Sequence, residues 1–407
     1  MMELKKLEMR MKLLPEIIQS TELIKAIRRD IHAHPELCFE EDRTSNVITE
    51  ILQSWGIEIH RGLGKTGVVG IIKGNLGPGK SIGLRADMDA LPLQEHNHFA
   101  HASVNDGKMH ACGHDGHIAM LLGAAEYFSK HKEFKGTIYC IFQPAEEGGG
   151  GAREMMRDGL FDLFPCDAVF GMHNWPGLPF GEFGVTPGPM MASSNEFVIT
   201  ISGKGGHAAL PHTSADPVFA ASQIVSALQG IITRNKRPID AAVLSITQFH
   251  AGDASNIIPN SAWIGGTVRT FTLDVLDLIE NRLHQIANSV ALAFDCKASI
   301  EFSRNYPPLI NHEKESLFAV DVMKDLVGEH RVNENIDPTM GAEDFAFMLQ
   351  EKPGCYVFIG NGDGDHRTQG HGLGPCQLHN PCYDFNDDLL PLGSSYWVQL
   401  ATKYLAN

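Results

Sequence analysis

Residues 109–117 (MHACGHDGH) place one thiol, three imidazoles and one carboxylate within nine positions. Thiolate and neutral imidazole are ligands that suit zinc and neighbouring first-row metals. Cys112 and His114 can both turn toward one ion from a tight loop that contains glycine. The alternative is a polar loop before a helix, with Asp115 as a helix cap and the histidines solvated. The metal interpretation therefore requires further ligands from other parts of the chain.

Three predicted strands end beside side chains that could supply those ligands. Residues 81–87 end in Asp87 and are followed by Asp89. Residues 136–142 precede Glu146 and Glu147, and residues 168–172 precede His173. Open α/β sheets bind ligands at the carboxyl ends of their strands, so these side chains are candidates for one site. For Asp87 and Asp89, the alternative is a role in a turn or a helix cap.

Glu146 and Glu147 can divide the work of a metal-dependent hydrolase. On an extended or turning backbone, adjacent side chains diverge, so one carboxylate can bind metal while the other acts as a base toward the substrate. The alternative is a pair of acids on a solvated loop. The apolar strand before them and the four glycines after them disfavour that alternative.

The length of 407 residues and a hydrophobic content of 43% predict two domains with real cores. Strands that alternate with helices predict an α/β domain with a mostly parallel sheet, formed by residues 1–188 and 306–407. Residues 189–305 show the order strand, helix, strand, strand, helix, strand of a ferredoxin-like α+β unit. Four prolines and four glycines within residues 176–189 mark the first boundary of this insertion.

The net charge of −16 argues against nucleic acid and acidic membranes as partners, because both select for basic surfaces. No apolar run reaches the roughly 18 residues of a membrane helix. Residues 1–20 mix charged with apolar side chains, unlike a signal peptide, so we expect a cytoplasmic protein. The eight cysteines are scattered irregularly, which does not fit a disulfide framework.

Five motifs resemble the amidohydrolase branch of the aminoacylase and carboxypeptidase-G-like dinuclear metallopeptidases. In chain order they are residues 85–92 (RADMDALP), 109–117, 143–147 (QPAEE), 173–176 (HNWP) and 205–208 (GGHA). The resemblance extends from about Ile27 to the C-terminus. The branch contains hippurate hydrolases, auxin-conjugate hydrolases and N-acetyl-diaminopimelate deacetylases. Within it, residues 64–70 and 95–101 are most similar to bacterial hippurate hydrolases.

The resemblance implies two divalent metal ions per subunit, of zinc or manganese, with cobalt or nickel also suitable. It implies Glu146 as the general base and Cys112 as the ligand that bridges the metals. The implied ligands are Cys112, His114, Glu147, His173 and His379. The wider family has a His-x-Asp motif where this chain has Asp87-Met88-Asp89, so His114 is expected to replace the missing histidine. The roles of Asp87 and Asp89 stay open.

In the inserted domain, the resemblance implies that His207 reaches into the partner subunit's active site and stabilises the oxyanion. It also implies that Asn256 contacts the substrate carbonyl and that Arg269 contacts the substrate carboxylate, which suits the planar fork of arginine. The expected assembly is a homodimer or homotetramer, with the insertion serving as lid and dimerisation domain.

The expected reaction is metal-dependent hydrolysis of N-acyl-L-amino acids, first of all hippurate to benzoate and glycine. One alternative is a deacetylase of N-acetyl-amino acids such as diaminopimelate, or an auxin-conjugate hydrolase. An alternative of another class is a noncatalytic, metal-binding dimeric protein. A glycine-rich loop at residues 361–375 carries His366 and His371, whose roles stay open.

Overall fold

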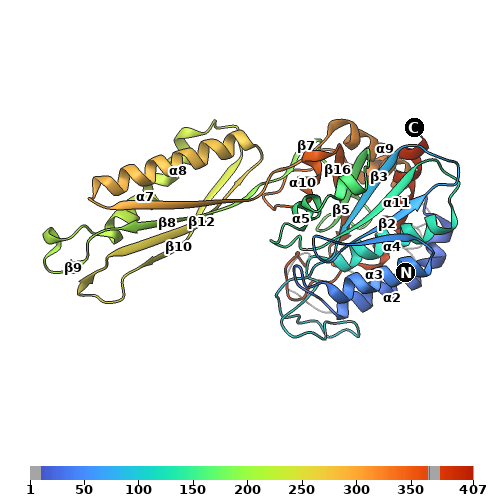
Figure 1. Cartoon of the computed structure of the whole chain (residues 1–407), viewed down its shortest axis with the longest axis horizontal. Coiled ribbons are helices and arrows are strands. Elements are labelled where there is room, and N and C mark those ends of the chain that lie inside the picture. The colour runs from blue at the N-terminus through green and yellow to red at the C-terminus, as the bar shows by residue number, and fades with distance from the viewer. Residues whose placement is uncertain (1–10, 365, 367–375, 407) are drawn as a thin grey trace. The chain divides into compact units, whose positions relative to one another are not determined.

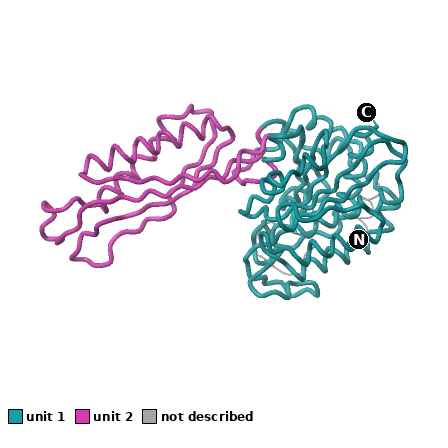
Figure 2. The backbone as a smooth tube through the Cα atoms, viewed as in Figure 1, with its two compact units in different colours: residues 1–188, 311–337, 347–407 teal, residues 189–310, 338–346 magenta. Residues whose placement is uncertain are grey.

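The computed structural model describes residues 11–364, 366 and 376–406 (Figure 1). The chain divides into two compact units (Figure 2). Unit 1 comprises residues 1–188, 311–337 and 347–407, and unit 2 comprises residues 189–310 and 338–346. Residues 338–346 join unit 2 because Thr339 accepts a backbone hydrogen bond from Ala192 and donates one to Met190.

Unit 1 is built on an eight-stranded sheet with the order β1-β2-β4-β3-β5-β16-β6-β15. The central strands β4, β3, β5 and β16 run parallel, while β1 and β2 form an antiparallel edge. The prediction of a mostly parallel sheet is confirmed. The strands are β1 (Glu58–Leu63), β2 (Gly67–Lys73), β3 (Ser81–Asp87), β4 (Thr137–Gln143), β5 (Ala168–Pro176), β6 (Phe183–Gly184), β15 (Val332–Asn333) and β16 (Gly354–Gly362).

The register of the central strands brings the predicted site residues to one edge of the sheet. Asp87 at the end of β3 lies opposite Gln143 at the end of β4, and Arg85 lies opposite Gly171 of β5. The segments that follow β3 and β4 therefore leave the sheet side by side, next to the last residues of β5.

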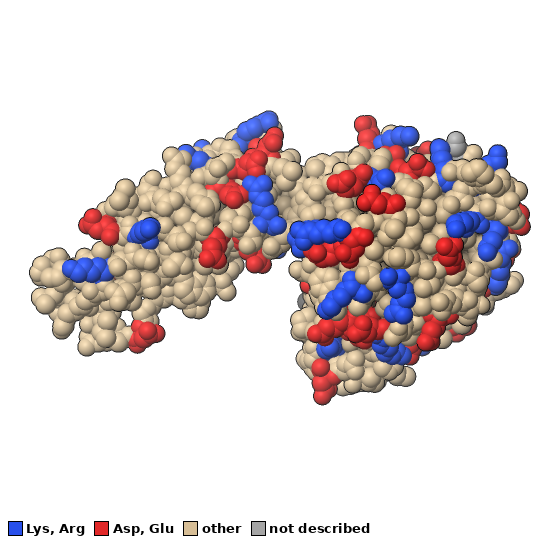
Figure 3. Space-filling model, viewed as in Figure 1, with Lys and Arg blue, Asp and Glu red and all other residues tan. Residues whose placement is uncertain are grey.

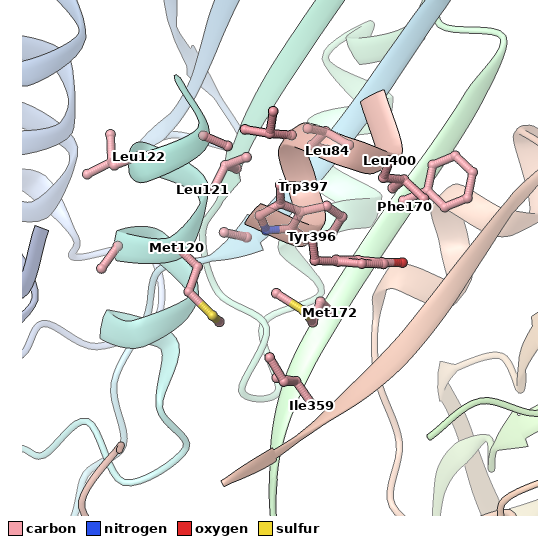
Figure 4. Close-up of a cluster of buried hydrophobic side chains, with 14 of the residues drawn as sticks. Leu84, Met120, Leu121, Leu122, Phe170, Met172, Ile359, Tyr396, Trp397 and Leu400 are labelled. Atoms are coloured by element: carbon pink, nitrogen blue, oxygen red, sulfur yellow. The ribbon is translucent and has the colours of Figure 1, made fainter. Parts of the chain in front are cut away.

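Helices α2, α4 and α11 pack on one another and on the sheet of unit 1. Figure 4 shows Met120, Leu121 and Leu122 of α4 together with Tyr396, Trp397 and Leu400 of α11 and with side chains of β3, β5 and β16. Because α4 is buried almost all round, its first residue His114 has a fixed position. The helices are α2 (Pro15–Ala33), α3 (Asp42–Ser54), α4 (His114–Lys130), α5 (Gly151–Arg157), α6 (Leu160–Leu163), α9 (Glu313–Val327), α10 (Phe345–Glu351) and α11 (Leu390–Ala406).

Unit 2 has a four-stranded antiparallel sheet with the order β10-β12-β8-β13, covered by α7 and α8. This strand order and the element order along the chain confirm the predicted ferredoxin-like α+β unit. A two-stranded ribbon of β9 and β11 continues beyond the end of β8. The elements are β8 (Ser194–Ser202), β9 (Gly206–His207), α7 (Pro217–Gly230), a π-helical turn (Ile231–Asn235), β10 (Ala242–Ala251), β11 (Ile257–Ile258), β12 (Ser261–Thr270), α8 (Leu273–Ala293) and β13 (Lys297–Tyr306). A further ribbon pairs β7 (Gly188–Met191) with β14 (Leu309–Asn311).

Acidic and basic side chains are interspersed on the face that Figure 3 shows, and no basic patch gathers there. Among the described residues, no helix combines the length and the hydropathy needed to cross a bilayer.

The Gly266→Ala substitution should destabilise unit 2. A Cβ atom at Gly266 on β12 would lie 2.1 Å from the backbone oxygen of Ser245 on the neighbouring strand. Relieving that clash should lower the free energy of unfolding by about 1–3 kcal/mol, measured by urea denaturation. The control is Gly230→Ala in α7, where a Cβ meets nothing within 4 Å. Gly230→Ala should be neutral or stabilising by up to about 1 kcal/mol. Wild-type stability of Gly266→Ala would contradict the clash.

Candidate metal centre

The Asp89 carboxylate fixes the turn that carries Glu146 and Glu147. Asp89 is buried, and its two oxygens accept hydrogen bonds from the backbone N–H groups of Glu146 (3.0 Å) and Glu147 (2.9 Å). Ala145, immediately before them, has φ +53°, a left-handed conformation that a non-glycine residue keeps only when its surroundings hold it. Asp89 is thus neither a helix cap nor a simple turn residue. It connects the segment after β3 to the segment after β4 by hydrogen bonds.

Two residues that the sequence analysis did not identify reinforce this turn. The buried Glu41 carboxylate accepts hydrogen bonds from the backbone N–H of Ala145 (2.9 Å) and from the hydroxyl of Thr66 (2.6 Å). The Cys38 thiol donates to Asp89 and approaches the backbone oxygen of Glu147, both at 3.1 Å. The sequence around Cys38 and Glu41 does not indicate these contacts, because all the partners are distant in the chain. Ala145 and Glu147 are more than 100 residues away, and Thr66 and Asp89 are 25 and 51 residues away.

Two imidazole rings of the predicted ligand set are oriented by backbone oxygens. Nδ1 of His114 lies 2.8 Å from the backbone oxygen of Asp89, and Nδ1 of His173 lies 2.6 Å from that of Asn174. A carbonyl only accepts hydrogen bonds, so each Nδ1 carries a proton and donates it. A neutral ring in this orientation presents its lone pair at Nε2, as metal-binding histidines do.

The structure brings all five predicted ligands together. Cys112 Sγ lies 3.4 Å from His173 Nε2. Glu147 Oε1 lies 3.2 Å from His379 Nε2 and 4.0 Å from His114 Nε2. The ligand atoms of Cys112, Glu147 and His379 are all within 4.8 Å of one another. Cys112 therefore adjoins both His173 and the group that contains Glu147, which is where a ligand shared by two ions would lie.

Two buried atoms of this cluster lack hydrogen bonds. Within the described chain, His114 Nε2 and Glu147 Oε1 are both buried without a hydrogen-bond partner. His379 Nε2 approaches Glu147 Oε1 to 3.2 Å without hydrogen-bond geometry, as expected of two atoms that face a common point. Unsatisfied buried polar atoms are costly, and a bound cation would remove that cost.

The charge balance of the cluster also fits cations. Burial opposes the charged form of His114, but Asp87 and Asp89 more than offset it and raise the pKa of His114 to about 10. Burial lowers the pKa of His173 well below its usual value. Burial, together with Glu147 and Glu146, raises the pKa of the Cys112 thiol. The site thus has an excess of negative charge, and a divalent cation would both neutralise it and favour the Cys112 thiolate.

Asp87 and His117 lie beside the ligands but use their polar atoms elsewhere. His117 Nδ1 donates to Asp87 at 2.6 Å, and His117 Nε2 accepts from the backbone N–H of Asn174 at 3.0 Å. The other oxygen of Asp87 accepts from Arg85 at 2.7 Å. Both side chains therefore orient their neighbours, and their atoms also lie in one group with His114 and His173 that could hold a metal ion.

The structure corrects the expectation that Asp115 caps a helix. Helix α4 begins after Gly113, which has φ +87°, and no side chain caps it. Instead, Asp115 Oδ2 forms an ion pair with Arg28 Nε (2.7 Å) and accepts a hydrogen bond from His32 Nδ1 (2.8 Å), with all three side chains fully buried. Burial opposes protonation of His32, but the carboxylates of Asp115 and Glu95 together outweigh this effect and raise the pKa of His32 to about 9. A buried cationic histidine thus contacts the residue that directly follows the predicted ligand His114.

Among the described residues, the groups that could hold a metal ion include neither His366 nor His110. His366 Nε2 is 3.1 Å from the backbone oxygen of Asp384, and His371 lies outside the described residues. His110 is buried, and its ring makes no hydrogen bond with the described part of the chain.

In unit 2, His207 and Asn256 are neighbours in the ribbon of β9 and β11. Ile257 pairs with His207, and Ala208 N–H donates to the backbone oxygen of Asn256. Arg269 is near the other end of β12, where it pairs with Val243. Arg269 lies eight positions after Ser261, which corresponds to about 26 Å along a strand. The three predicted substrate contacts of unit 2 are therefore divided between two ends of its sheet.

Comparison with known proteins connects this geometry to one family. The family model of peptidase family M20/M25/M40 matches residues 83–403. The hippurate hydrolase of Campylobacter jejuni is 42% identical, over 97% of this chain and 100% of that protein. The IAA-amino acid hydrolase ILR1-like 5 of Arabidopsis thaliana is 39% identical, over 93% of this chain and 86% of that protein.

A solved structure extends the likeness to the fold. The chain is similar to a dinuclear metal-binding peptidase of the M20 family from Bacillus subtilis, with a TM-score of 0.81 and 35% identity. The match covers 95% of this chain and 98% of that structure.

The charged His32 should make stability depend on pH. Its folded pKa is about 9, above the ordinary value of 6.5. Its contribution, of about 3 kcal/mol, is therefore complete below pH 6.5 and is lost as the pH rises through 9. The difference in unfolding free energy between wild type and His32→Gln should shrink over that range, measured by urea denaturation at several pH values. A difference that stays constant over that range would refute the charged state of His32.

Proposed function

The chain belongs to peptidase family M20/M25/M40 and is a metal-dependent amidohydrolase, and we propose that it cleaves N-acyl-L-amino acids, with hippurate as its preferred substrate. The observation that carries the proposal is the turn clamped by Asp89, which presents Glu146 directly beside the ligand Glu147. The identity of 42% to a hippurate hydrolase supports the choice of substrate.

We propose that Cys112, His114, Glu147, His173 and His379 hold two divalent ions, with Cys112 shared between them. Zinc and manganese suit this mixture of sulfur, nitrogen and oxygen ligands, as do cobalt and nickel. When bound, such ions supply a Lewis acid and a water of lowered pKa.

Glu146 is proposed as the residue that moves the proton. Its carboxylate would take a proton from the attacking water as the water oxygen bonds to the amide carbon. It would return that proton to the amide nitrogen as the C–N bond breaks, leaving an acid and a free amino acid. Glu146 is suited to this role because it is buried and has a carboxylate oxygen within 4.8 Å of the proposed ligand atoms of His114 and Glu147.

Residues of unit 2 are proposed to bind the substrate. His207 Nδ1 accepts a hydrogen bond from Ala209 N–H at 3.0 Å, so a neutral ring carries its proton on Nε2 and can donate it to an oxyanion. Arg269 is half buried and, among the described residues, makes no hydrogen bond through its guanidinium, which leaves it available for a carboxylate. Asn256, next to His207, would contact the substrate carbonyl.

The separation of these residues supports a site completed by two copies of the chain. An N-acyl amino acid has the length of about two extended residues, or roughly 7 Å. We infer that it cannot reach both His207 and Arg269 of one unit 2, because the ribbon that carries His207 adjoins the Ser261 end of β12 and about 26 Å of strand lies between Ser261 and Arg269. We therefore propose a homodimer, alone or within a homotetramer, in which unit 2 acts as lid and dimerisation domain and His207 serves the partner's site.

Two other activities are distinguishable from hippurate hydrolysis. The N-acetyl-L-cysteine deacetylase of Bacillus subtilis is 38% identical, which makes deacetylation the second candidate. A panel of hippurate, N-acetyl-amino acids and indole-acetyl conjugates would rank these substrates. Release of no amino acid from any of them by metal-loaded protein would favour a noncatalytic metal-binding protein. The eight free cysteines support our proposal of a cytoplasmic location.

The Glu146→Gln substitution should abolish turnover while sparing the metals. Loss of the proton shuttle should lower kcat by about two to four orders of magnitude. Hydrolysis of hippurate and metal content, by elemental analysis, are measured on the same preparation. The control is Glu154→Gln on the exposed side of α5, which should leave both unchanged. Near-normal kcat for Glu146→Gln would disprove the assignment.

Inactive variants should complement each other in a mixed dimer. His207→Ala should lose about two to three orders of magnitude in kcat. When His207→Ala and Glu146→Gln chains are co-expressed with different tags and the heterodimer is purified, one of its two sites has both residues. We expect about half of the wild-type rate per dimer, from hippurate hydrolysis. A heterodimer as inactive as its parents would show that His207 does not act across the interface.

A further inference from the structure

Arg28 is a fully buried cation that three carboxylates surround. Its guanidinium contacts Asp115 at 2.7 Å, Asp384 at 2.7 Å and Asp387 at 3.3 Å. It also lies over the ring of Phe385, 5.7 Å from the ring centre. An arginine with this many partners is rigidly placed, because its planar fork of five donors is nearly filled.

These partners belong to the two segments that carry proposed metal ligands from opposite parts of the chain. Asp115 directly follows His114, and Asp384 lies five residues after His379. The segments meet closely, since a Cβ at Gly116 would lie 2.3 Å from the ring of Phe385 and one at Gly113 would lie 2.6 Å from the hydroxyl of Tyr383. His379 N–H also donates to the backbone oxygen of Ala111 at 2.8 Å.

His379 particularly needs such support. Its side chain is 55% exposed, in contrast to the fully buried His114, and its backbone has φ +63°. A non-glycine residue in that conformation keeps it only when neighbouring contacts hold it there. Tyr383 and Phe385 pack against Gly113 and Gly116 at the start of α4. The ion pair of Asp384 with Arg28 adds a second connection, because Arg28 also pairs with Asp115 in the first turn of α4.

We propose that Arg28 is a positioning residue of the metal centre, which sets the distance between His114 and His379 through Asp115 and Asp384. This inference rests on the proposed ligand set. Arg28 does not touch any ligand atom, and its effect is expected in the affinity for metal, because groups behind the ligands commonly change that affinity by about 10–100-fold.

The test measures Co²⁺ binding to chelator-treated full-length protein by absorption spectroscopy, together with the melting temperature. Asp384→Ala removes one arm of the contact and leaves Arg28 two other carboxylates, so the chain should still fold. Arg28→Lys keeps the charge but loses the fork. The first control is Arg29→Ala, which breaks an ion pair of the adjacent residue to Asp387. The second is Leu52→Ala, which destabilises the core at buried Leu52 of α3, away from the ligands.

Both Asp384→Ala and Arg28→Lys should raise the Kd for Co²⁺ by about tenfold or more, while both controls should stay within about twofold of wild type. Unchanged Co²⁺ affinity in Asp384→Ala would overturn the inference. An equal rise of the Kd for Co²⁺ in Leu52→Ala would also overturn it, because the effect would then come from lower stability alone. If wild-type protein binds no Co²⁺, the proposed metal centre itself fails, and this inference fails with it.

Discussion

The two hydrogen bonds that the Asp89 carboxylate accepts from the backbone N–H groups of Glu146 and Glu147 are the contacts on which the rest of the site depends. They join the segment after β3 to the segment after β4 and hold Ala145 in a left-handed conformation. The backbone oxygen of Asp89 also accepts a hydrogen bond from Nδ1 of His114. One residue therefore fixes the proposed base and two proposed ligands, and it can do so only because β3 and β4 are adjacent and parallel.

The proximity of the residues that follow β3, β4 and β5 was predictable, because short stretches of sequence indicate both the strands and the polar residues at their ends. Each of the strands β3, β4 and β5 is an apolar run that ends near an acid or a histidine, and the carboxyl ends of parallel strands meet at one edge. The ferredoxin-like order of unit 2 was likewise readable from alternating strand and helix patterns. His379 differs, because nothing in its surroundings predicts a ligand. It entered the predicted set only through family resemblance, and the structure brings it within 3.2 Å of Glu147.

The supporting residues were not predictable, because each depends on partners that are distant in the chain. Arg28 meets Asp384 across 356 positions, and His32 meets Asp115 across 83. In the sequence, Arg28 and His32 belong to an ordinary helix of mixed polarity, and charged residues on such a helix are usually solvated. Asp115 was misjudged for the same reason: at the first turn of a helix an acid commonly interacts with free backbone N–H groups, but here a buried arginine and histidine compete successfully for it.

Buried charges of this number are poorly explained by stability. Removing Arg28, His32 and Asp115 from water costs several kcal/mol for each ion, and a well-packed apolar cluster of the same volume is often at least as stable. An apolar cluster does not fix the positions of its side chains as closely, because apolar contacts tolerate small shifts. A guanidinium bound to Asp115 and Asp384 permits little movement of either carboxylate. The requirement for such fixed positions is greatest next to ligands that must hold cations at fixed distances. The location of the charged cluster, behind His114 and beside the His379 segment, is therefore better explained by the geometry of the metal centre than by the energy of folding.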